Sequence, residues 1–175
     1  MHEDLTEIIE IPENVEISID SLVSVKGPKG EMKKSLPVEV KKDGNKIILE
    51  AKKATKKEKK LIKTTKAHLN NMIKGVLEGY EYNLQICSVH FPITASIEKD
   101  TVIIKNFLGE TRERRAKILP NVKAKIEGDI IKVTSVDKEA AGQTAANIEI
   151  ATKIKNRDRT RFQDGIWITK KGGEE

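Results

Sequence analysis

The residues of this chain best suited to grip phosphate are its six arginines, which form two tight clusters in the second half of 175 residues. A guanidinium group presents a planar fork of donors that binds phosphate oxygens in pairs and stacks on bases, whereas lysine is a flexible, hydrated point charge. The first half carries its positive charge on lysine alone. Clusters this dense favour contact with RNA or DNA over ordinary surface charge, provided that the fold brings them together. The clusters are Arg112, Arg114 and Arg115, and Arg157, Arg159 and Arg161.

The overall composition agrees with a folded protein that has a basic bias. Lysine and arginine number 33 against 27 acidic residues, which gives a formal charge of +6 and an isoelectric point near 9.2. The first twenty residues hold seven acids and no lysine or arginine, so we expect that end to avoid a polyanion. The single cysteine fits a reducing cytosol, no apolar run approaches the ~20 residues of a membrane span, and the acidic start lacks the basic region of a signal peptide. We therefore expect a cytoplasmic protein with no membrane partner.

The order of local signals indicates an internal duplication. The segment 25–31 (Val-Lys-Gly-Pro-Lys-Gly-Glu) corresponds to 104–110 (Ile-Lys-Asn-Phe-Leu-Gly-Glu). A Leu-Pro break and an acidic residue followed by glycine then recur in the same order in both halves. We expect two copies of one unit of roughly 80 residues, which is a common domain size. The predicted domains are residues 1–81 and 82–175, with the second as the main RNA-binding half.

Hydrophobic periodicity predicts an α+β unit. Apolar residues alternate with polar ones over 15–19, 38–41 and 122–126, which is typical of antiparallel strands with one buried face. The segment from about Lys56 to Glu78 and a second segment around 141–151 show helical spacing instead. A further strand is expected from Leu84 to Val89. Each copy should thus be a small antiparallel sheet packed against one helix.

The chain offers little for catalysis or metal binding. His2, His68 and His90 are scattered, and a single cysteine leaves no zinc-ligand spacing. Cys87 and His90 lie three apart on the expected strand, so they would point to opposite faces and form a poor nucleophile pair. The glycine-rich segment at 26–30 lacks the Gly-Lys-Ser/Thr ending of a nucleotide-binding loop. We predict no catalytic residue, no metal, no cofactor and no small-molecule substrate.

Two other features leave alternatives open. Residues 52–66 hold eight lysines, which could form a nucleic-acid patch, although the solvated face of an amphipathic helix is the favoured interpretation. Aromatic residues are few, and Phe107, Phe162 and Trp167 lie beside the arginine clusters. Core packing is the usual role of such side chains, but Phe107 lies in a predicted turn, where burial is less certain. Recognition should therefore rely on phosphate, ribose and shape.

Four segments, together with the duplication, carry a resemblance to a known family. They are Lys-Gly-Pro-Lys-Gly-Glu (26–31), Tyr-Glu-Tyr-Asn-Leu-Gln-Ile leading to His-Phe-Pro-Ile (80–93), Asn-Phe-Leu-Gly-Glu (106–110) and Arg-Phe-Gln-Asp-Gly-Ile-Trp (161–167). Over nearly its whole length the chain resembles the large-subunit ribosomal protein six family, in its archaeal and eukaryotic branch. The Tyr-Lys-Gly-Lys-Gly segment of bacterial members is absent, and residues 153–167 take its place.

The resemblance implies a structural protein that binds large-subunit rRNA near the base of the factor-binding stalk and the sarcin–ricin region, with neighbouring ribosomal proteins as further partners. It also implies that the second domain makes the main RNA contact. The alternatives are a free-standing RNA-binding protein or chaperone, and an enzyme on a duplicated scaffold. The predicted rRNA-binding residues are Lys105, Asn106, Phe107, Arg112, Arg114, Arg115, Lys153, Lys155, Arg157, Arg159, Arg161, Lys170 and Lys171.

Overall fold

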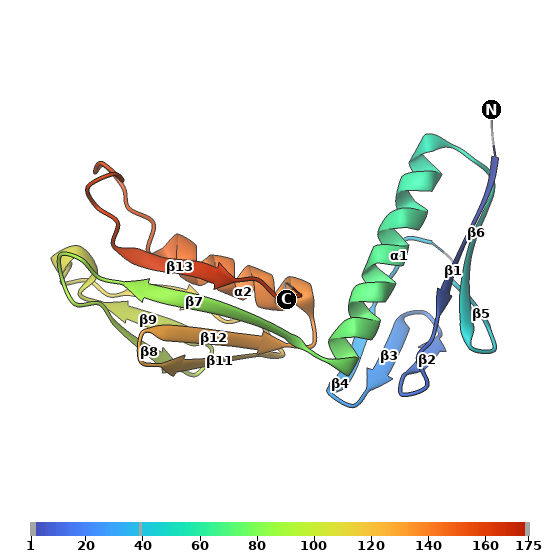
Figure 1. Cartoon of the computed structure of the whole chain (residues 1–175), viewed down its shortest axis with the longest axis horizontal. Helices are drawn as coiled ribbons and strands as arrows, with labels where there is room; N and C mark the ends of the chain where they lie inside the picture. The colour runs from blue at the N-terminus through green and yellow to red at the C-terminus, as the bar shows by residue number, and fades with distance from the viewer. Residues whose placement is uncertain (1–2, 39, 174–175) are drawn as a thin grey trace. The chain divides into compact units, whose positions relative to one another are not determined.

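The computed structural model describes residues 3–38 and 40–173, and the chain divides into two compact units, Met1–Gly79 and Tyr80–Glu175 (Figure 1). The first unit contains six strands and one helix within its described residues. Its strands form two antiparallel sheets, ordered β1-β6-β5 and β2-β3-β4. The elements are β1 (Glu3–Glu10), β2 (Glu16–Ile19), β3 (Val23–Gly27), β4 (Gly30–Lys34), β5 (Lys41–Asp43), β6 (Lys46–Ala54) and α1 (Lys56–Leu77).

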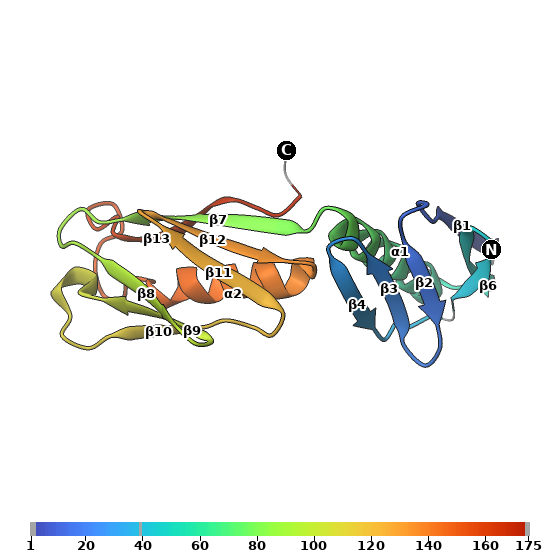
Figure 2. The same cartoon turned by 90° about the horizontal axis from the view of Figure 1, so that it is seen from below.

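The second unit repeats this plan and extends it by one strand. Its sheets are ordered β10-β9-β8 and β11-β12-β7-β13, and every pairing is antiparallel. Figure 2 shows α2 lying between the two sheets of the unit. The elements are β7 (Tyr80–Cys87), β8 (Thr94–Glu98), β9 (Thr101–Lys105), the 3₁₀ turn η1 (Phe107–Gly109), β10 (Arg114–Lys117), β11 (Val122–Glu127), β12 (Ile130–Ser135), α2 (Lys138–Ala151) and β13 (Gly165–Lys170).

The duplication and the α+β class are confirmed by this correspondence. The order β1-β6-β5 in the first unit matches β7-β12-β11 in the second, and each last hairpin turns at a glycine of positive φ, Gly44 (56°) and Gly128 (60°). Only glycine adopts that conformation at little steric cost. Each unit has two small sheets, where the sequence predicted one, because the residues that precede the Leu-Pro break close a sheet of their own.

Two predicted strands are wrong in their limits. Residues 38 and 40 lie outside any strand, and the strand begins at Lys41; Glu39 lies outside the described residues. Pro37, which has no N–H to donate to a ladder, precedes this segment. The strand expected to reach Val89 ends at Cys87, because the N–H groups of Val89 and His90 donate to the carboxylate of Asp164.

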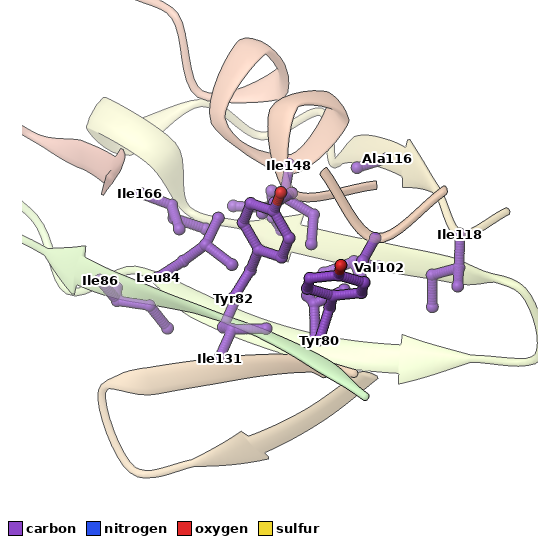
Figure 3. Close-up of a cluster of buried hydrophobic side chains, with 14 of the residues drawn as sticks. Tyr80, Tyr82, Leu84, Ile86, Val102, Ala116, Ile118, Ile131, Ile148 and Ile166 are labelled. Atoms are coloured by element: carbon purple, nitrogen blue, oxygen red, sulfur yellow. The ribbon is translucent and has the colours of Figure 1, made fainter. Parts of the chain in front are cut away.

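The core of the second unit fills the space between α2 and the sheets. Tyr80, Tyr82, Leu84 and Ile86 alternate along β7 and are all buried, as the period of a strand with one covered face requires. Figure 3 shows Tyr82, Leu84 and Ile166 gathered around Ile148 of α2. This packing fixes the directions in which α2 ends and β13 begins, and the segment between them carries the second arginine cluster.

The hairpin between β3 and β4 packs in close contact with the end of α1. Lys29 donates its backbone N–H to the carbonyl of Val76 over 2.9 Å, which satisfies a carbonyl of the last helical turn. A Cβ atom at Gly27 would lie 2.8 Å from Cγ2 and 2.9 Å from the carbonyl oxygen of Val76. Glycine is therefore required at this approach.

Replacement of Gly27 by alanine should destabilise the first unit by about 1–3 kcal/mol, because the added methyl group forces the hairpin away from α1. Denaturant unfolding followed by hydrogen exchange of α1 would measure this loss. Lys26→Ala, in the same strand but exposed, is the control and should have little effect. Equal stability of Gly27→Ala and Lys26→Ala would show that the contact is not tight.

Candidate nucleic-acid interface

The two arginine-bearing segments lie side by side at one end of the second unit. We call residues 105–115 the turn segment and residues 153–163 the cationic loop. Arg114 joins them, because its Nη1 donates to the carbonyls of Ala151 (2.9 Å) and Lys153 (3.2 Å), where α2 has just ended. Its Nε and Nη2 donate to the carboxylate of Glu110 at 2.8 and 2.6 Å. Figures 1 and 2 both show the two segments at the same end of the unit.

Arg114 is consequently a structural residue. It satisfies carbonyls at the helix C-terminus, where a cation is also favoured by the helix dipole. Its guanidinium carbon lies 4.3 Å from the centre of the Phe107 ring, and its side chain is only 23% exposed. The four hydrogen bonds leave its fork little capacity for phosphate. Arg114 therefore positions the cationic loop, and the prediction that it belongs to the contact surface is withdrawn.

Phe107 is also removed from that surface. Its side chain is 1% exposed and belongs to the core of the second unit. A ring covered by Arg114 and the core has no free face for a base. The turn that holds it uses left-handed backbone at Asn106 (φ 58°) and Leu108 (φ 51°), which swings Phe107 inward. Asn106 itself is exposed and donates from Nδ2 to the carbonyl of Pro92 at 3.0 Å.

Glu110 neutralises Arg114 at every pH near neutrality. The hydrogen bonds from Arg114 lower the pKa of Glu110 below its ordinary value, against the effect of burial. The charges of Arg114 and Arg157 lower this pKa further. The effect of Arg157 on this pKa agrees with the closeness of the two segments that the hydrogen bonds of Arg114 establish.

The remaining cations of the turn segment are exposed. Arg115 forms a pair with Glu113, with Nε 2.9 Å from Oε1, and Lys105 lies 4.0 Å from the same carboxylate. The hydrogen bond from Arg115 lowers the pKa of Glu113 and raises that of Arg115. Such exposed pairs contribute little to stability, so phosphate can replace the carboxylate at small cost. Arg112 is exposed and forms no ion pair within residues 80–173.

The cationic loop presents five exposed cations around one acid. Asp158 accepts hydrogen bonds from Thr160 N (2.9 Å) and Thr160 Oγ1 (2.7 Å), and its carbonyl accepts from Phe162 N (2.9 Å). The hydrogen bonds from Thr160 lower the pKa of Asp158, so this carboxylate stabilises the turn within the loop. In the described part of the unit none of the five cations is ion-paired. They are Lys153, Lys155, Arg157, Arg159 and Arg161.

The far end of the cationic loop is fixed by a buried carboxylate that the sequence analysis missed. Asp164 is 1% exposed, and its Oδ1 accepts the N–H groups of Val89 (2.7 Å) and His90 (2.9 Å). Its Oδ2 lies 2.6 Å from Nδ1 of His90. Burial acts to raise the pKa of Asp164, but these hydrogen bonds from His90 and Val89 outweigh it and hold the pKa below its ordinary value.

The buried Asp164 is connected to the surface through two stacked aromatic side chains. The His90 ring stacks on Phe162 with 4.6 Å between centroids and 24° between planes. The guanidinium carbon of Arg157 lies 4.9 Å from the centre of the Phe162 ring. The sequence showed Asp164 only as part of a turn before the last strand, and no local signal connects it with His90, 74 residues earlier. His90 is thus a positioning residue.

Lys170 and Lys171 are not brought to this surface. Lys170 pairs with Asn83, whereas the start of β13 at Gly165 pairs with Cys87 next to the anchor. The two lysines are exposed at the opposite end of β13 from the cationic loop (Figure 1). Among the described residues no group of three histidine, cysteine or acidic side chains is placed to hold a metal ion. No described helix is long and apolar enough to cross a membrane.

Comparison with known proteins gives matches along most of the chain. The family described as Ribosomal protein L6 matches residues 11–79 and 91–165, one segment in each unit. A protein of Methanobrevibacter smithii named large ribosomal subunit protein uL6 is 46% identical over 171 residues, covering 95% of this chain and 96% of that protein. Proteins with the same name from Staphylothermus marinus and Aeropyrum pernix are 47% and 43% identical; they cover 97% and 94% of this chain, and this chain covers 96% and 93% of them.

Loss of the buried carboxylate should destabilise the second unit in a pH-dependent way. Asp164→Ala leaves the N–H groups of Val89 and His90 without their acceptor, which should cost about 2–4 kcal/mol at neutral pH. Because the folded-state pKa of Asp164 lies below the ordinary value of 3.8, its stabilisation is complete above that pH and is lost as pH falls through the folded-state pKa. Urea unfolding at a series of pH values, followed by Trp167 fluorescence, would measure the difference.

The exposed acid Glu81, on β7 of the same unit, provides the control, and Glu81→Ala should change stability little. A stability difference for Asp164→Ala that stayed constant on acidification would contradict the assignment of the charged carboxylate as the anchor.

Proposed function

The chain belongs to the ribosomal protein L6 family, whose relatives are proteins of the large ribosomal subunit, and we propose that its second unit binds large-subunit rRNA through the turn segment and the cationic loop. It is a structural component of the subunit and not an enzyme. The proposed binding site lies near the base of the factor-binding stalk and the sarcin–ricin region, as the family resemblance implies. Neighbouring ribosomal proteins at that position would be its other partners.

One observation carries the proposal: the cationic loop holds five exposed cations without an internal ion pair, within the described residues, on a backbone fixed at both ends. Unpaired cations gathered on one loop repel each other, and a polyanion relieves that repulsion while counterions are released from the nucleic acid. The proposed phosphate contacts are Arg112, Arg115 and Lys105 from the turn segment with Lys153, Lys155, Arg157, Arg159 and Arg161 from the cationic loop. Asn106 supplies a neutral donor beside them.

The internal pairs define which residues the RNA can recruit. Arg114 is committed to Glu110 and to the end of α2, and Phe107 is buried beneath it. Arg115 and Lys105 share one exposed acid, Glu113, and can exchange it for phosphate. The rRNA contact should therefore depend most on the cationic loop.

A free-standing RNA-binding protein or chaperone would show the same surface and differ in where the protein resides. Co-sedimentation with large ribosomal subunits at high salt separates the two functions. Retention on the subunit supports the structural role, and release at moderate salt together with RNA annealing activity would support the chaperone.

Alanine replacement of Arg157, Arg159 and Arg161 together should weaken binding to large-subunit rRNA and reduce its salt dependence. Each lost phosphate contact removes roughly 0.7–0.9 from the slope of log affinity against log salt, so the triple variant should flatten the slope by about two. Filter binding or fluorescence anisotropy over a range of salt concentrations measures it.

The matched control replaces Lys56, Lys57 and Lys60, three exposed cations of α1 in the first unit. Both triple variants remove the same charge, so the comparison tests position. If the lysine variant weakened binding as much as the arginine variant, RNA binding would be a diffuse effect of net charge and the proposed site would be wrong.

A further inference from the structure

An open pocket of about 680 Å³ lies beside the cationic loop, where the end of β7 faces the start of β13. This volume is in the range of sites for small organic ligands, ~300–1,000 Å³. Its walls come from the end of β7 and the residues just after it, and from the end of the cationic loop and the start of β13. The lining residues are Cys87, Val89, Arg159, Phe162, Gln163 and Trp167.

Two aromatic side chains give the pocket flat apolar walls that are held in place. Phe162 is stacked on His90, which is itself fixed by Asp164. Trp167 lies against Gly165, where a Cβ atom would be 3.1 Å from Cε2 of the indole, and its Nε1 donates to the Gln163 carbonyl at 3.4 Å. Rigid aromatic surfaces of this kind are the platforms on which proteins stack unpaired bases.

The polar lining residues match the other parts of a nucleotide. Arg159 forms no ion pair within residues 80–173, so its guanidinium is available for the phosphate or for a base plane. The side-chain amide of Gln163 forms one long bond, from Nε2 to the carbonyl of Thr160 at 3.5 Å. Its oxygen and second N–H can meet the edge of a base, because an amide offers both a donor and an acceptor.

We propose that this pocket receives one unpaired nucleobase of the RNA that the cationic loop binds, stacked on Trp167 and bounded by the edge of Phe162, with Arg159 on its phosphate. The inference rests on the proposed function and adds a base-binding subsite to a surface otherwise made for phosphate. The occupant is a nucleotide because the pocket combines an aromatic surface with the most cationic loop of the unit, whereas an apolar peptide side chain would bring no anion to Arg159.

The chain contains a single cysteine and a single tryptophan, and both line the pocket. The full-length protein is mixed with a large-subunit rRNA transcript, and complex formation is measured by sedimentation. In the complex, alkylation of Cys87 should slow at least tenfold, and Trp167 fluorescence should be quenched by the stacked base. Heparin, a polyanion without bases, should bind the loop and leave both signals unchanged.

A pocket-filling variant tests the same inference by affinity. Val89 is 68% exposed, so Val89→Phe should fold normally while placing a ring over the pocket, and it should weaken rRNA binding about tenfold, the loss of one stacked base. Ile8→Phe, at an apolar side chain that is 52% exposed in the first unit, is the control and should bind like the wild type.

The outcomes separate the two proposals. A complex in which Cys87 remains reactive and Trp167 unquenched, equal effects of rRNA and heparin, or wild-type affinity of Val89→Phe would each overturn the base-binding pocket and leave rRNA binding by the loop intact. Failure of the wild-type protein to bind the transcript would overturn the proposed function itself.

Discussion

The end of the second unit that carries the cationic loop depends on the need to satisfy a buried carboxylate. Asp164 is removed from solvent, and an unpaired charge there would be prohibitive. Its two oxygens therefore bind the backbone after β7 and the ring of His90, which ends one strand and aligns the next. At the other end of the cationic loop, Arg114 binds the carbonyls that follow α2. The cationic loop, whose five cations repel one another, is thus held at both ends by a charged side chain that is hydrogen-bonded within the unit.

Geometry divides the arginines into two roles although their chemistry is the same. Arg114 lies on β10 and faces α2, where Glu110 and helix carbonyls occupy its donors. Arg115, the next residue along the strand, points to the opposite face and stays exposed. The arginines of the cationic loop are exposed and form no ion pair within residues 80–173, although Arg157 lies over the Phe162 ring. Arg114 is used internally and fixes the scaffold, whereas the exposed arginines are the ones proposed to contact the RNA.

The sequence predicted what local periodicity and turn chemistry determine. The α+β class, the duplication, α1 and the two glycine hairpins follow from spacing, and the closeness of the two arginine clusters follows from the order of hairpin and helix. The sequence did not show that Arg114 is structural and Arg112 is not, because the role of Arg114 depends on the carbonyl of Ala151, 37 residues away. The burial of Phe107 was not predicted, because it depends on left-handed backbone at Asn106 and Leu108, and neither position holds the glycine that would have signalled this conformation. Lys170 and Lys171 follow the cationic loop in sequence, but β13 carries them to its far end.

Hydrogen exchange of the full-length protein, free and bound to large-subunit rRNA, tests the central claim most directly, because it maps the contact along the whole chain at once. The structure predicts new protection in the cationic loop and the turn segment, with α1 and the strands of the first unit unchanged. Protection that was centred on the lysine-rich start of α1, with the cationic loop exchanging as freely as in the unbound protein, would contradict the account.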